Sequence, residues 1–83
     1  MPKLLVEVFV PVAGRAFDMF IPAHLMLYDA LRLMNKMVAE LSGGLFVPDG
    51  ETTLCDRQTG AILNINLSVA ELNLQNGSKL MLM

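Results

Sequence analysis

Two side chains in this 83-residue sequence could act as a nucleophile, a general base or a soft metal ligand: one histidine, His24, and one cysteine, Cys55. A zinc site takes three or four protein ligands. Because the chain has no second His or Cys, neither residue predicts a metal centre. We expect His24 to be a surface residue near a helix start and Cys55 to be a half-buried small apolar residue on a strand.

The acidic residues gather most closely at Asp49, Glu51 and Asp56, around a turn. Their spacing does not match the ligand pattern of an EF-hand loop, so we expect a solvated loop and no calcium site. The glycines form no phosphate-cradling motif. The sequence therefore predicts a protein that is not an enzyme and that uses no metal or other cofactor.

The composition limits the kinds of partner. The formal net charge is −2 and no basic run is present, so nucleic acid is not an expected partner. Hydrophobic residues make up 54% of the chain, yet no stretch approaches the roughly 20 apolar residues that a membrane span needs. We therefore expect no direct membrane insertion.

The length and the cysteine count indicate the number of domains and the cellular compartment. Eighty-three residues predict one domain, over 1–83. A single cysteine fits a reducing, cytoplasmic location. The chain has more apolar residues than one small core can use, so some should lie on the surface, where they favour a protein partner or a self-contact.

One long helix is expected over 27–42, and the other elements of the fold must pack against it. At about 100° per residue its apolar side chains share one face: Leu27, Ala30, Leu31, Met34, Met37, Val38 and Leu41. No strong N-cap residue precedes the helix, and Gly43 and Gly44 favour its end. A helix this amphipathic needs a sheet or other helices to cover its apolar face. Tyr28 and Leu33 lie on its flanks.

The rest of the sequence favours short strands. Alternation and β-branched content predict strands at 4–12, 16–21, 52–56, 61–63 and 78–83. If Glu7 and Asp18 face solvent, their apolar neighbours in the first two strands face the core. Ser68 and Glu71 form a capping box that should open one helical or 3₁₀ turn. The expected order is β-β-α-β-β-short helix-β.

The run LSVAELNLQNGSKLML at 67–82 is similar to the last third of ubiquitin. There a Leu-Ser opens a short helical turn and an apolar-x-apolar strand closes the fold. The order of elements also resembles the β-grasp. This resemblance implies an α+β fold in which a mixed sheet of four to five strands packs on one main helix. The first and last strands would pair in parallel at its centre.

Within that fold the sequence resembles the small YukD/EsaB-type ubiquitin-like proteins that accompany bacterial type VII secretion machines. The matching features are the length, the strand VEVFVPV, and the strand AFDMFIP followed by a Leu/Met-rich helix. The resemblance implies a non-enzymatic bacterial protein-interaction module that docks non-covalently on a larger assembly, such as a membrane-bound secretion component. Ubiquitin is conjugated through a flexible Gly-Gly tail. This sequence ends at Met83, so we expect no conjugation through that end.

Alternation places an apolar patch on the sheet face away from the helix, which is also a partner-binding face of ubiquitin. Its members are Leu5, Phe9, Phe20, Leu54, Met81 and Met83. Leu54 belongs to it only if Thr53 and Cys55 point inward. Methionine suits such a surface because its flexible thioether adapts to varied partners.

Three other readings of the patch and the chain stay open. Loops could cover part of the face, in which case scattered exposed apolar residues carry no function. The protein could be a carrier or modifier, attached covalently after processing or through Lys36 or Lys79. The same patch could also close a homodimer, making the protein a self-associating structural subunit.

Overall fold

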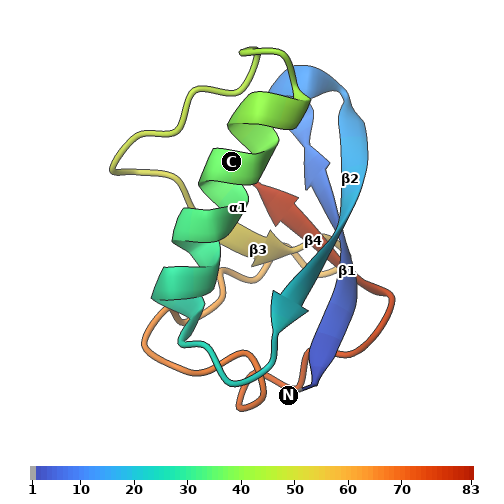
Figure 1. Cartoon of the computed structure of the whole chain (residues 1–83), viewed down its shortest axis with the longest axis vertical. Coiled ribbons are helices and arrows are strands. Elements are labelled where there is room, and N and C mark those ends of the chain that lie inside the picture. Colours follow the sequence, from blue (N-terminus) through green and yellow to red (C-terminus); the bar gives the residue numbers. More distant parts are fainter. Residues whose placement is uncertain (1) are drawn as a thin grey trace.

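The computed structural model describes residues 2–83, which form four strands, one α-helix and one 3₁₀ helix. In chain order these are β1 (Lys3–Val10), η1 (Pro11–Ala13), β2 (Arg15–Pro22), α1 (Leu27–Leu41), β3 (Leu54–Asp56) and β4 (Ser78–Leu82). The sheet order is β2-β1-β4-β3. β1 and β4 pair in parallel at its centre, and the outer pairs are antiparallel. The predicted mixed sheet with α1 packed across one face is confirmed (Figure 1).

The core lies between the sheet and α1. Alternate residues of the strands and one stripe of the helix are buried there: Val6, Val8, Val10, Phe17, Met19, Ile21, Leu80, Leu82, Leu27, Ala30, Met34 and Val38. The alternation predicted for the first two strands is thus confirmed. The buried helix stripe is narrower than predicted, because Leu31 and Met37 only border the core and Leu41, in the last turn, is 53% exposed.

Backbone carbonyls of a distant loop accept hydrogen bonds from the first N–H groups of α1. The first N–H groups of a helix have no acceptor within it, and within residues 2–83 no side chain caps Met26, the N-cap residue. Instead, the Leu27 N–H donates to the Leu67 carbonyl at 2.8 Å and the Tyr28 N–H to the Ile65 carbonyl at 3.1 Å. The absence of a local cap residue, expected from the sequence, is therefore compensated by the segment near residue 66.

The first hairpin differs slightly from expectation. β1 ends at Val10, because Pro11 has no N–H for the ladder and starts η1 instead. Gly14 then takes φ +66°, a left-handed conformation that costs glycine little, and returns the chain into β2.

The predicted strand at 61–63 was wrong. Residues 2–83 contribute only a single bridge there, between Ile62 and Cys55. The Asp56 N–H donates to the Ala61 carbonyl and the Leu63 N–H to the Leu54 carbonyl, both at 2.9 Å. Since pairing does not extend past these two bonds, the sheet of the described residues has four strands.

The predicted capping box forms and opens a single hydrogen-bonded turn, in which the Leu72 N–H donates to the Ser68 carbonyl at 3.1 Å. The Ser68 N–H donates to Glu71 Oε1 at 2.9 Å, and the Glu71 N–H donates to Ser68 Oγ at 3.1 Å. These reciprocal bonds fix the turn that carries Val69 into the core, where its side chain is fully buried.

Candidate functional site: the outer sheet face

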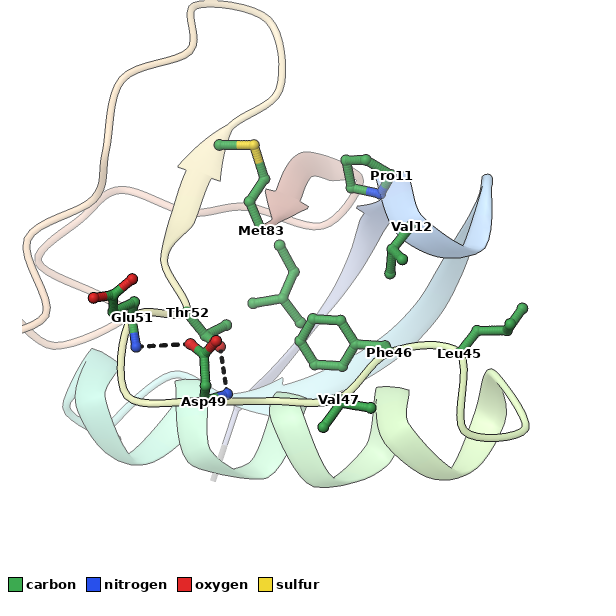
Figure 2. Close-up of a pocket in the computed structure, with 10 residues that line it drawn as sticks. Pro11, Val12, Leu45, Phe46, Val47, Asp49, Glu51, Thr52 and Met83 are labelled. Atoms are coloured by element: carbon green, nitrogen blue, oxygen red, sulfur yellow. Dashed lines mark hydrogen bonds between the residues drawn. The ribbon is translucent and has the colours of Figure 1, made fainter.

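The sheet face opposite α1, called here the outer face, carries two groups of apolar side chains. Phe9 and Met81 are register partners across the central parallel pair, and both are half-buried. Met83 follows on the same side of the chain and is 53% exposed. Figure 2 shows its side chain pointing away from α1. Phe9, Met81 and Met83 are called the Met81 cluster.

Leu5 and Phe20 form the second group, called the Phe20 pair. They are register partners in the antiparallel pair of β1 and β2. Phe20 is 63% exposed and Leu5 is 37% exposed. Exposure of a phenylalanine to this extent leaves most of its ring in water, so the pair is available for contact with another molecule.

A row of four charged residues separates the two groups. Glu7 lies between Leu5 and Phe9 on the outer face of β1, opposite Asp18 on β2 and Lys79 on β4. Arg57, just after β3, donates its backbone N–H to the Lys79 carbonyl at 3.0 Å. The predicted single patch is therefore divided by a row that is acidic toward β2 and basic toward β3.

Arg57 connects this charged row to the Met81 cluster. Its Nη1 lies 3.9 Å from Glu7 Oε2, and its guanidinium carbon lies 4.2 Å from the centre of the Phe9 ring. The ion pair is partly exposed and contributes about 0–1 kcal/mol, and the cation–π contact adds a similar amount. The planar guanidinium thus covers part of Phe9 while its charge stays accessible to a partner.

Arg57 was not predicted to lie on this face, because it follows the strand expected at 52–56. Alternation gives a signal for it only once the direction of the β3 side chains is known. Cys55 lies on the outer side of β3, and continued alternation past Asp56 puts Arg57 on that same side. Lys79 lies on the same face, opposite Glu7, and its part in a charged row was not predicted.

Leu54 does not belong to the outer face, and its predicted place in the patch was wrong. It is the register partner of Leu82, a core residue, and only 1% of its surface is exposed. Because partners across a ladder share one face, Leu54 must also face the core. Cys55 instead pairs with Met81 on the outer side, yet it is only 1% exposed. It is more buried than expected and adds no accessible surface.

The remaining candidate residues lie apart from this face. His24 is exposed before α1, as predicted. Asp49 Oδ1 accepts the Glu51 N–H at 2.8 Å, and Asp56 Oδ1 accepts the Gln58 and Thr59 N–H groups at 2.8 and 3.1 Å. These carboxylates therefore stabilise their own loops. Across residues 2–83, no three His, Cys, Asp or Glu side chains are grouped to hold a metal ion.

No protein-family model and no curated protein sequence matches the chain. Solved structures do match it. The ubiquitin-like domain of EccD5 from Mycobacterium xenopi is 24% identical with a TM-score of 0.72, covering 100% of this chain and 94% of that one. The ubiquitin-like domain of the Mycobacterium tuberculosis type VII secretion system protein ECCD1 is 16% identical with a TM-score of 0.68, covering 100% and 99%.

A third match is a chain of the MycP5-free ESX-5 inner membrane complex. It is 23% identical with a TM-score of 0.69, and the match covers 98% of this chain and 20% of that one. At these identities the likeness establishes the fold, which is the ubiquitin-like β-grasp predicted from the sequence. The structural neighbours include ubiquitin-like domains of type VII secretion proteins, as the resemblance implied. In the described part of the chain, no helix is long and apolar enough to cross a bilayer.

Proposed function

We propose that this protein is a non-enzymatic, ubiquitin-like docking module of a bacterial type VII secretion system, related to the YukD/EsaB type and acting in the cytoplasm. It binds a protein component of the membrane-bound machine non-covalently through the outer sheet face. Proteins of unrelated function can share one fold. The structural neighbours therefore support only the link to type VII secretion, and the outer face supports non-covalent docking.

The observation that carries the proposal is the placement of the exposed apolar side chains. The Phe20 pair and the Met81 cluster lie on one face and come from three strands. Core packing does not require large apolar groups there, since the core lies on the other side of the sheet. Flexible Met side chains and Phe are residue types that protein interfaces favour.

The charged row supports a specific orientation. Asp18 and Glu7 occupy the β2 side of the row, and Lys79 and Arg57 the β3 side. A partner with the opposite arrangement of charges would be attracted in one orientation and repelled in the reverse one. The apolar groups on either side would supply the buried area, while the row would set the register.

Affinity capture from solubilised host membranes tests the proposal. The baits are the wild-type protein, Met81→Asp, Phe20→Asp and a matched control, Leu33→Asp, whose residue is 47% exposed on α1. Wild type and the control should retain a secretion component, identified by peptide mass spectrometry. Burying an Asp in the interface should cost about 2 kcal/mol or more, roughly 30-fold in affinity.

Two results would argue against the proposal. Equal capture by Met81→Asp, Phe20→Asp and wild type, with all three folded by circular dichroism, would remove the outer face from the interface. A covalent adduct in the intact mass of the native protein would favour the hypothesis of a covalently attached carrier or modifier instead.

A further inference from the structure

A groove opens at the end of the sheet where η1, the C-terminal end of β4 and the loop after α1 meet (Figure 2). Its volume is about 580 Å³, within the range of sites that hold a few side chains of a ligand. We call it the hairpin groove. Its lining residues are Pro11, Val12, Leu45, Phe46, Val47, Asp49, Glu51, Thr52, Leu82 and Met83.

The walls of the groove are apolar and exposed. Val12 is 63% exposed, Leu45 is 62% exposed and Val47 is 76% exposed. Phe46, between the last two, is 5% exposed and packs in the core, and its N–H donates to Ser42 Oγ at 3.1 Å. Burial of Phe46 explains why its neighbours point outward, but it does not require those neighbours to be apolar.

The polar end of the groove is acidic. Asp49 and Glu51 line it at the end away from Leu45 (Figure 2), and its lining within the described residues includes no Lys, Arg or His. Asp49 Oδ1 accepts the Glu51 N–H, and Thr52 Oγ1 accepts the Asp49 N–H at 3.1 Å. These bonds fix the loop, while the Glu51 carboxylate makes no hydrogen bond or ion pair with residues 2–83.

We propose that the hairpin groove binds a short cationic amphipathic segment of a protein partner. Apolar side chains of that segment lie between Val12, Leu45 and Val47, and a Lys or Arg lies beside Asp49 and Glu51. An apolar groove without charged residues would not indicate which kind of molecule binds in it. The acidic end of this groove disfavours anionic lipid. It also selects against a second copy docked groove to groove, since each acidic end would then face either the other acidic end or apolar walls, and neither arrangement pairs a carboxylate with a cation.

This proposal does not rest on the proposed function, because the groove and the outer face share only Met83. The two surfaces are therefore separable by mutation. Val47→Ser and Leu45→Ser alter the groove walls, whereas Met81→Asp alters the outer face alone.

Defined synthetic peptides test the groove. The first is a 14-residue helix-forming peptide with Leu at every third or fourth position and Lys between them. In the second, Glu replaces Lys, and in the third, Ser replaces Leu. Affinity is measured by fluorescence anisotropy, and the binding site is mapped from amide chemical shifts. The Lys peptide should perturb Val12, Leu45, Val47 and Glu51, and each of the other two peptides should bind at least about tenfold more weakly.

Matched variants separate a local site from general attraction to an acidic protein. Asp49→Asn/Glu51→Gln should weaken the Lys peptide by about three- to tenfold, since two partly screened ion pairs are lost. Asn keeps the acceptor oxygen that holds the loop. Asp29→Asn/Glu40→Gln makes the same change in net charge on α1, away from the groove and the outer face, and should leave the affinity unchanged. Val47→Ser should weaken binding without moving the unfolding midpoint.

Several results would overturn the inference. They are equal weakening by both charge-neutralising pairs, equal affinity for the Lys and Glu peptides, shifts confined to the outer face, and no binding of the Lys peptide. A dimer in light scattering whose groove amides are perturbed without peptide would assign the groove to a second copy instead.

Discussion

At the scale of single residues, Leu54 and Met81 show how register decides a side chain's role. Both belong to neighbouring strands at one end of the sheet, yet Leu54 is buried in the core while Met81 lies half-buried on the opposite face. A shift of one residue in β3 exchanges the two faces. The sequence TTLCD offers apolar or small residues for either choice, so alternation alone could not decide the direction.

Substitutions at these two positions should therefore differ sharply in stability. Leu54→Ala removes buried methyl groups and should cost about 2–5 kcal/mol in the free energy of unfolding. Leu54→Asp buries an unpaired charge and should abolish the fold. Met81→Asp should stay within about 1 kcal/mol of wild type, because the new carboxylate reaches water. Urea denaturation checks this, and a stable Leu54→Asp variant would contradict the register.

A second prediction at this scale concerns Glu71. Hydrogen bonds from the backbone N–H and the hydroxyl of Ser68 lower the pKa of the Glu71 carboxyl below its ordinary value. Because the folded pKa is lower than the unfolded one, the stabilisation is present above the unfolded pKa and is lost as the pH falls through the folded pKa.

Carboxyl-carbon NMR titration measures that effect. Glu71 should titrate at a lower pH than an ordinary glutamate, and Ser68→Ala should raise its pKa part of the way back, since the backbone N–H of residue 68 remains. An unchanged Glu71 pKa in Ser68→Ala would mean that the Ser68 hydroxyl does not stabilise the Glu71 carboxylate.

At the scale of elements, the central parallel pair depends on the turn before β4. The Gly77 N–H donates to the Leu5 carbonyl at 2.7 Å, and Asn76 Oδ1 accepts the Leu5 N–H at 2.9 Å. Gly77 has φ +88°, which favours glycine. The two residues thus hydrogen-bond the turn before β4 to Leu5 of β1.

Asn76→Ala should release the Leu5 N–H to solvent. The expected cost is about 1 kcal/mol in the free energy of unfolding, and hydrogen exchange at the Leu5 amide should accelerate while that of Val8 stays slow. Asn76→Asp keeps an acceptor and serves as the control. Unchanged Leu5 protection in Asn76→Ala would show that the side-chain bond does not matter.

The elements also show which parts of the fold the sequence can predict. The spacing of Val6, Val8 and Val10, and the helical stripe ending near Val38, identify β1 and α1 because periodicity is a local property. The capping of α1 by carbonyls of Leu67 and Ile65 is not local, and no pattern near residue 27 predicts it. The end of pairing at Ile62 likewise depends on contacts made across the chain.

The candidate site likewise has a part that the sequence predicts and a part that depends on contacts between strands and loops. Leu5, Phe9, Phe20, Met81 and Met83 were placed on the outer face by alternation within their own strands. The charged row depends on register between strands, which the residues of one strand do not determine. The hairpin groove needs η1 and the loop after α1 to approach the end of β4, so its members share no sequence signal.

At the scale of the whole molecule, a small domain presents two surfaces that its own core does not use. The outer face joins two apolar groups across a charged row, and the hairpin groove joins apolar walls to an acidic end. Met83 borders both. One partner could therefore extend over the end of the sheet from the face into the groove, or two partners could bind separately.

Photo-crosslinking in the native host tests the docking face most directly. A photoreactive amino acid is placed at position 81, at position 20 or, as the control, at position 33, and adducts are identified by mass spectrometry. We predict adducts to the same secretion component from positions 81 and 20, and none to it from position 33. No adduct from position 81 or 20, or an equal yield from position 33, would contradict the account that this ubiquitin-like protein docks through its outer sheet face.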